Sequence, residues 1–166
     1  MIALIPARGG SKRLPRKNVR ELAGRPLIHW SIAMAKCVPE IQRTIVSTDD
    51  AEIAEIARAS GAEVMMRPEE LATDLSTSAS VAQHVLRTLA DDEAYEPTAV
   101  VLLQPTCPLR PYALVRAALD AFKARAVDSV VSVTLSREKS GHITGGLFRP
   151  AYRPGTRSQD LPPAYF

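Results

Sequence analysis

Short apolar runs alternate with amphipathic stretches along most of the chain, and this alternation limits the possible folds more than any other feature. Five runs are apolar or β-branched and typical of strands, most of them covered on both faces: 2–6, 43–48, 62–66, 98–104 and 129–134. Apolar residues at helical spacing predict helices over 27–37, over 50–60, from Ser76 or Ser78 through Leu89, and from Pro111 through Phe122. This order predicts parallel βαβ units, and therefore a three-layer α/β/α sandwich with a mainly parallel, Rossmann-like sheet. The run 98–104 is expected to be its most buried strand.

The helix after the second run has recognisable signals at both ends. Asp49 precedes it and Glu52 follows three residues later, which is a capping-box-like start, and Gly61 is the matching stop. The neighbouring carboxylates of Asp49 and Asp50 are candidates either for metal binding or for an N-cap and its neighbour. The N-cap interpretation is favoured, because Asp before a helix ordinarily accepts from the first free amides.

Three polar loops of unusual composition leave the ends of predicted strands. They are residues 7–25, 48–50 and 105–110. In parallel α/β sheets, ligands bind outside the carboxyl ends of the strands. We therefore expect these three loops to converge on one site.

The first loop, RGGSKRLPRKN, contains five basic residues and two glycines around one serine. It matches neither the P-loop pattern GxxxxGK[ST] nor GxGxxG. Two glycines nevertheless allow close approach of the backbone, Ser11 offers a hydroxyl, and the basic side chains offer positive charge to a polyphosphate. A solvated basic turn explains the same composition equally well, and the residues alone leave both interpretations open.

Two further segments offer polar groups beside strand ends. The loop QPTCPLRP is stiffened by its prolines and presents Gln104 and Thr106. Arg67 and the hydroxyl run 76–80 have side chains that hydrogen-bond a nucleobase or cap a helix, and Ser76 and Ser78 suit both roles.

Composition excludes several classes of protein. The formal charge of +3 is too small to indicate nucleic-acid binding, and no aromatic residues are interleaved with the basic cluster. Cys37 and Cys107 form no CxxC pair, and no His, Cys and carboxylate residues have a metal-site spacing or a Ser-His-Asp order. No apolar stretch approaches the ~20 residues that cross a bilayer, and no signal peptide is evident. We expect a cytoplasmic protein that binds neither nucleic acid nor membrane.

The periodic pattern decays after residue 134 into a segment rich in glycine and proline. We expect one domain over residues 1–166 that is incomplete at its C-terminal end. Within it, residues 136–166 are expected to form an irregular segment that serves acceptor binding and dimerisation.

Several motifs together resemble the acylneuraminate cytidylyltransferases of bacteria, the CMP-sialic acid synthetases. They are IPARGGSKRLPRKN, GRPLIHWSI, IVSTDDAEIAEIA, GAEVMMRPEELATD, LLQPTCPLR and RSQDLPPAY, in this order and nearly from end to end. The related Kdo cytidylyltransferases have an opening loop closer to ARxxSTRLPGK and an aspartate in the loop after the buried strand. Thr106 stands in that loop here, which argues against the Kdo branch.

The resemblance implies a nucleotidyltransferase that joins CMP from CTP to a nonulosonic acid, a nine-carbon 2-keto acid sugar, and releases pyrophosphate. The acceptor hydroxyl would attack the α-phosphorus in line with the leaving group, so catalysis would depend mainly on positioning and charge neutralisation. Mg²⁺ would assist, and a homodimer is implied. The sequence does not distinguish sialic, legionaminic and pseudaminic acids as the acceptor.

The resemblance also assigns roles to residues, motif by motif. Arg8 and Lys17 would be catalytic by offsetting negative charge. The implied CTP-binding residues are Arg8, Gly9, Gly10, Ser11, Lys17, Asn18, Arg67, Ser76 and Ser78, the last three at the cytosine. The implied acceptor-binding residues are Gln104, Arg110, Arg157 and Gln159. No metal ligand is implied within this chain, because the expected aspartates lie beyond Phe166.

Two departures from the family keep other hypotheses open. Cys107 replaces the usual serine, and REKSGHIT replaces the stretch that usually follows SVVSV. Because the metal-binding aspartates of the family are expected beyond Phe166, a non-catalytic nucleotide-binding fragment is the main alternative, beside a Kdo-type enzyme and, more distantly, a basic protein that contacts RNA.

Overall fold

The computed structural model describes residues 1–12, 14–125, 127–133, 135–136, 141–144, 147–151 and 164–165. The chain forms two compact units, Met1–Arg116 and Ala117–Phe166. Among the described residues, no helix is long and apolar enough to cross a membrane. The first unit contains the sheet and every residue that forms the candidate site.

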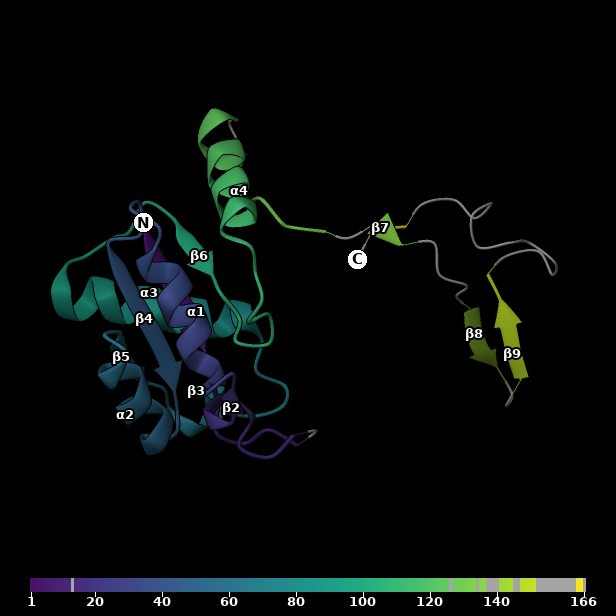
Figure 1. The fold of residues 1–166 in the computed structure, drawn as a ribbon, viewed down its shortest axis with the longest axis horizontal. Helices are drawn as coiled ribbons and strands as arrows, with labels where there is room; N and C mark the ends of the chain where they lie inside the picture. The colour runs from purple at the N-terminus through teal and green to yellow at the C-terminus, as the bar shows by residue number, and fades with distance from the viewer. Residues whose placement is uncertain are drawn as a thin grey trace. The chain divides into compact units, whose positions relative to one another are not determined.

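A four-stranded parallel sheet organises the first unit (Figure 1). Its strand order is β5-β4-β1-β6, with bounds Glu63–Met66, Arg43–Thr48, Ile2–Pro6 and Val100–Leu102. Ile2 pairs with Arg43 on one side and with Val100 on the other, so β1 is an interior strand. A continuous apolar run is stable in that position because both faces and both edges are covered.

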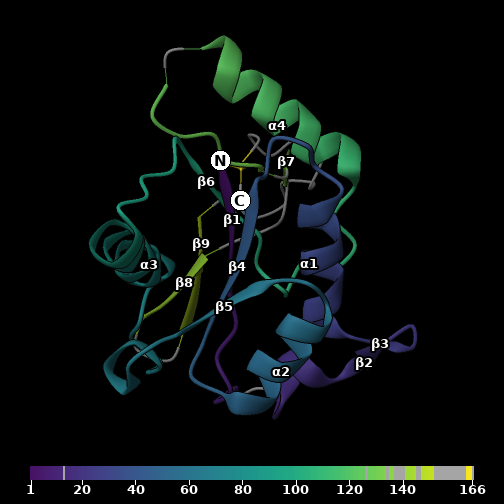
Figure 2. The same cartoon turned by 90° about the vertical axis from the view of Figure 1, so that its left-hand side faces the viewer.

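Helices cover both faces of this sheet, as predicted (Figure 2). Ala3 and Ile5 of β1 point to one face, where they pack with Ile28 and Ile32 of α1 (Leu27–Lys36) and with side chains of α2 (Ala51–Ala59). Ile2 and Leu4 point to the other face and pack with side chains of α3 (Ser78–Glu93). Successive side chains of a strand alternate between faces, so one apolar run supplies both cores of the three-layer sandwich.

The helix ends follow local rules, with one correction. The N-cap of α2 is Asp50 and not Asp49: the Asp50 carboxylate accepts from the Ile53 amide at 2.9 Å. Gly61 follows the helix with φ +79°, a conformation that favours glycine, and so confirms the predicted stop. Pro111 precedes α4 (Tyr112–Ala124), and Thr77 caps α3.

Two of the five predicted strands differ from expectation. The run 98–104 forms only the three-residue β6, and Leu102 is 42% exposed, so this strand is not the most buried. It lies at the edge of the described sheet, where its outer side has no strand beside it. Residues 129–133 form no strand, and Val131 is 75% exposed. A β-branched run becomes a strand only where a neighbouring strand pairs with it.

Short elements complete the described chain. The first unit also has η1 (Lys17–Val19), the hairpin of β2 (Glu21–Leu22) and β3 (Arg25–Pro26), and η2 (Glu69–Leu71). In the second unit, β7 (Leu135–Ser136) pairs with β10 (Ala164–Tyr165), and β8 (Gly141–Thr144) pairs with β9 (Leu147–Pro150). The segment 136–166 thus contains short strands, and its role in acceptor binding and dimerisation stays a prediction.

Candidate functional site

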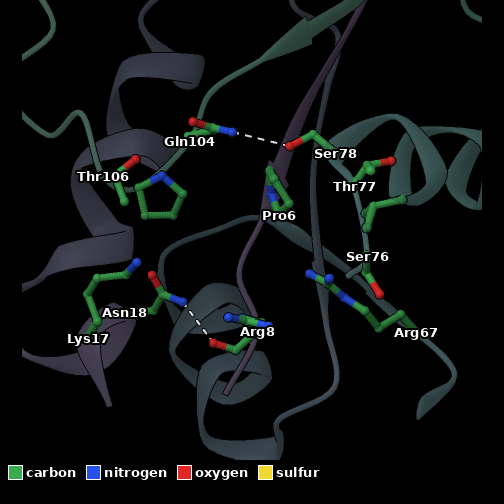
Figure 3. A pocket seen from close by; sticks show the side chains of 12 residues that line it. Pro6, Arg8, Lys17, Asn18, Arg67, Ser76, Thr77, Ser78, Gln104 and Thr106 are labelled. Carbon is green, nitrogen blue, oxygen red and sulfur yellow. Dashed lines mark hydrogen bonds between the residues drawn. The ribbon is translucent and has the colours of Figure 1, made fainter. Parts of the chain in front are cut away.

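A cavity of about 190 Å³ lies at the carboxyl ends of β1 and β6, where two of the three polar loops converge (Figure 3). Its lining residues are Pro6, Arg8, Lys17, Asn18, Arg67, Ser76, Thr77, Ser78, Val81, Gln104, Pro105 and Thr106. The third loop, 48–50, does not line the cavity and contacts the first loop instead. Seven predicted site residues therefore meet in one place.

The five basic side chains of the first loop have different partners. Arg8 and Lys17 line the cavity. Arg16 forms ion pairs with Asp50 and Glu52, which raise its pKa, so its charge is compensated away from the cavity. Lys12 forms an ion pair with Asp74, and Arg13 lies outside the described residues. Among the described basic residues of this loop, only Arg8 and Lys17 line the cavity, and both are residues that the family resemblance selects.

The pair Asp49 and Asp50 holds the first loop against the end of β4. The Gly9 amide donates to Asp49 Oδ1 at 3.1 Å, so this donor is already bonded within the protein. A Cβ on Gly9 would lie 2.5 Å from Asp50 Oδ2, so glycine is required there by the carboxylate. The loop geometry therefore depends on Asp49 and Asp50.

Of the other residues predicted to bind CTP in this loop, Asn18 lines the cavity, whereas the glycines and Ser11 do not. Asn18 is buried and donates from Nδ2 to the Arg8 carbonyl at 2.9 Å, which fixes the two ends of the loop to each other. Gly10 has open space where its Cβ would be, and the Ser11 amide donates to the Gly9 carbonyl at 3.0 Å. Gly9, Gly10 and Ser11 do not line the cavity, so their expected role as a phosphate cradle remains a prediction.

Arg67 is a buried cation in the cavity wall. Its Nη2 donates to the Ser47 carbonyl at 2.5 Å and its Nη1 to the Leu71 carbonyl at 3.2 Å. No described carboxylate forms an ion pair with it, and its buried Nε has no hydrogen-bond partner among the described residues. Burial lowers the pKa of Arg67, and the nearby charge of Arg8 lowers it further, whereas Asp49 raises it. A buried cation with a spare donor is suited to hold a polar or anionic ligand.

The turn before α3 supplies hydroxyl groups. Ser76 Oγ donates to the Glu70 carbonyl at 3.1 Å and lies 3.0 Å from Thr73 Oγ1, so it is occupied within the turn. Thr77 Oγ1 accepts from the Ser80 amide at 3.0 Å as the helix cap. Ser78 Oγ accepts from Gln104 Nε2 at 3.2 Å and keeps its own proton for another acceptor.

The loop after β6 forms the remaining wall. Gln104 and Thr106 line the cavity, and Arg110 Nη2 donates to the Gln104 carbonyl at 3.3 Å. Arg110 thus lies beside the cavity without lining it. The other two residues expected at the acceptor, Arg157 and Gln159, lie outside the described residues.

The described carboxylates do not form a metal site. No group of three or more His, Cys, Asp or Glu side chains within the described ranges is placed to hold a metal ion. Asp50 and Asp74 are bonded to basic side chains of the first loop instead, and Arg16 lowers the pKa of Asp50. These residues alone do not fit Mg²⁺, and the expectation that its ligands lie beyond Phe166 stays a prediction.

Three residues that the structure places around the site received no individual role there from the sequence, although Asp49 and Thr77 lie in segments that were expected at the site. Asp49 anchors Gly9, Asp74 pairs with Arg8, and Thr77 lines the cavity while capping α3. A detectable signal existed for Asp49, since a carboxylate directly after a buried parallel strand lies at the ligand-binding edge of the sheet. Asp74 had no such signal.

Fold comparison defines the class of protein first. The structure of a CMP:2-keto-3-deoxy-manno-octonic acid synthetase complexed with CTP is similar to this chain, with a TM-score of 0.61 at 23% identity over 80% of this chain and 49% of that one. The chain therefore has the nucleotidyltransferase α/β fold. The sequence profile described as Cytidylyltransferase matches residues 2–143. The chain belongs to the cytidylyltransferase family, which confirms the resemblance seen in the motifs.

Two curated relatives are similar over most of this chain. An N-acylneuraminate cytidylyltransferase of Escherichia coli O18:K1:H7 is 38% identical over 141 residues, which are 84% of this chain and 32% of that protein. A CMP-N,N'-diacetyllegionaminic acid synthase of Legionella pneumophila is 43% identical over 138 residues, which are 81% of this chain and 57% of that protein. The chain thus spans between about a third and rather more than half the length of these relatives.

Proposed function

We propose that this protein transfers CMP from CTP to a nonulosonic acid and releases pyrophosphate. One observation carries the proposal: the side chains of Arg8, Lys17 and Arg67 line one cavity at the carboxyl ends of the strands, and none of the described carboxylates lines it. Converging cations attract a polyanion, and Arg8 alone of the three has an ion-pair partner among the described residues, namely Asp74, which lies outside the cavity lining. The names of the relatives support cytidine as the nucleoside and a nonulosonic acid as the acceptor.

The cavity walls suggest how the substrates would be distributed. Arg8 and Lys17, the proposed catalytic residues, would bind the triphosphate and stabilise the charge that develops on the leaving pyrophosphate. Arg67 and Ser78 would bind the cytosine, because they combine a spare donor and a hydroxyl on one wall. Gln104, which donates to Ser78 and has Arg110 beside it, would bind the acceptor.

The reaction would proceed by positioning. The acceptor hydroxyl would attack the α-phosphorus while the pyrophosphate leaves in line, with its charge offset by the two loop cations. No general base is assigned, since no described histidine or carboxylate lines the cavity. A homodimer in which the segment 136–166 completes the acceptor site is part of the same proposal.

The test is pyrophosphate release that requires two substrates. Release with CTP, Mg²⁺ and one member of a panel of nonulosonic acids, and its absence when either CTP or the acid is omitted, would establish the activity. The acid that supports the highest kcat/KM would identify the acceptor. Release of pyrophosphate with CTP, Mg²⁺ and Kdo, but with none of the nonulosonic acids, would instead establish the Kdo-type alternative.

The non-catalytic alternative predicts a different result in the same assay. Such a protein binds CTP, measured by isothermal titration calorimetry, and releases no pyrophosphate with any acid. Failure to bind CTP at all would overturn both proposals. An RNA affinity that falls steeply with increasing salt concentration would support the remaining hypothesis, a basic protein that contacts RNA.

A further inference from the structure

Asp74 joins the two sides of the candidate site. Its Oδ1 lies 2.6 Å from Arg8 Nη2, and its other oxygen forms an ion pair with Lys12. Asp74 is itself outside the cavity lining, whereas Arg8 is part of it. One carboxylate of the turn before α3 thus neutralises two cations of the phosphate-binding loop.

Hydrogen bonds on both sides of Asp74 hold the turn that carries it. The Arg67 amide donates to the Thr48 carbonyl at 2.8 Å, and the Arg67 side chain bonds the Leu71 carbonyl. Hydrogen bonds of Ser76 close the turn just beyond Asp74. Lys12, in contrast, has a side chain that is 82% exposed. When an anion enters, the long loop side chains are therefore the groups that are able to move.

The carboxylate of Asp74 offers the same chemistry as a phosphate oxygen. Both are anionic acceptors for Arg and Lys donors, and they repel each other at short range. Lys12 and Arg8 lower the pKa of Asp74, so the carboxylate is ionised at neutral pH and present as a competitor. A polyphosphate that approaches Arg8 meets a position that is already occupied.

We propose that Asp74 is a resident counter-ion, which holds Arg8 and Lys12 when no nucleotide is bound and gives up both side chains to an incoming polyphosphate. The inference rests on the phosphate-binding part of the proposed function, since it requires that Arg8 binds a polyphosphate. The same carboxylate takes the two cations back when pyrophosphate departs. Asp74 therefore limits polyphosphate affinity and favours product release.

The test uses inorganic tripolyphosphate, which has the charge of the triphosphate without a base. Asp74→Asn should bind it about threefold to tenfold more tightly in isothermal titration calorimetry, because two exposed ion pairs no longer have to be broken. The gain should shrink at high salt, which screens exposed charges. Pyrophosphate affinity should rise by a similar factor.

Glu69→Gln is the matched control. Glu69 is an exposed carboxylate of the same segment with no ion pair among the described residues, and its replacement changes the net charge by the same amount. If Asp74→Asn binds tripolyphosphate equally or less tightly than the unmodified protein, or if Glu69→Gln gains as much, the resident counter-ion is overturned. If the unmodified protein binds tripolyphosphate but not CTP, the proposed function fails while this inference stands. If it binds neither, both fail.

Discussion

Two arginines at opposite ends of the sheet show how the same side chain serves structure or ligand binding. Arg43 begins β4, and its guanidinium forms ion pairs with Glu63 and Glu93, the latter at 2.6 Å. It also lies over the Tyr95 ring, with Cζ 4.9 Å from the ring centroid. The hydrogen bonds that Arg43 donates to the Glu63 and Glu93 carboxylates raise the pKa of Arg43. All of its charge is compensated within the described chain.

Arg67 follows β5 at the other end of the sheet and has the opposite environment. It is 8% exposed, bonds only backbone carbonyls, and has a lowered pKa because of burial and the nearby Arg8. A buried cation without a carboxylate partner is costly, and such costs are concentrated at functional sites. The comparison teaches that the partners of an arginine, rather than its presence, distinguish the two ends.

The largest effect should come from removing the charge of Arg67. Arg67→Met keeps the length of the side chain but loses every donor, so CTP affinity should fall by about a hundredfold, since bonds to charged groups contribute strongly. Isothermal titration with CTP measures it. The fold should survive, because the Ser47 carbonyl still accepts from the Ala7 amide at 2.9 Å. Arg43→Met is the matched control and should bind CTP normally. An equal loss of CTP affinity in the two variants would contradict the proposed difference between Arg67 and Arg43.

Arg8→Ala should have the next largest effect. Arg8 is a cavity cation whose charge is shared with Asp74, so its removal should weaken CTP binding by about tenfold or more. Thermal unfolding should change little, because the side chain is partly exposed and the Arg8 carbonyl, which Asn18 bonds, is kept. Unchanged CTP affinity and unchanged turnover would remove Arg8 from the site.

Arg43→Met should affect stability instead of binding. Loss of two partly exposed ion pairs and one cation–π contact should lower the free energy of unfolding by about 1–2 kcal/mol. Urea unfolding at low and high salt measures it, and the difference from the unmodified protein should narrow at high salt. A stability equal to that of the unmodified protein would mean that this cluster contributes nothing.

The layers of the fold could be predicted from the sequence because they depend on local pattern. The run 43–48 is a strand with those bounds, and the first run packs on both faces, as its continuous apolar character indicated. The run 129–134 has equally strong strand character, yet residues 129–133 form none. Pairing with a neighbour is a non-local condition, so composition does not reveal it.

The site could be predicted only in part, for a related physical reason. The composition of the first loop indicates positive charge, but it does not indicate which of the basic side chains line the cavity and which form ion pairs elsewhere. Arg16 pairs with Asp50, 34 positions away, and both Lys12 and Arg8 pair with Asp74, so three of the cations are compensated by carboxylates distant in sequence. The family motifs selected Arg8 and Lys17, which line the cavity. A motif identifies the residues used at the site of known family members, and so it does not require knowledge of the distant partners of each cation.

The smallest effect on nucleotide binding should come from replacing Ser76 or Ser78. The two variants test whether the serines near Arg67 have different roles, one in binding the base and one in holding the turn. Ser78 has a proton available for the ligand, whereas Ser76 is bonded within its own turn. Ser78→Val should therefore narrow the preference for CTP over UTP by about threefold to tenfold, since a lost bond to a neutral group costs little. Ser76→Val should weaken both nucleotides alike by loosening the turn. Competition binding with the two nucleotides gives the ratio for each variant. A ratio that stays constant in Ser78→Val would place base recognition elsewhere, and a ratio that changes only in Ser76→Val would reverse the roles of the two hydroxyls.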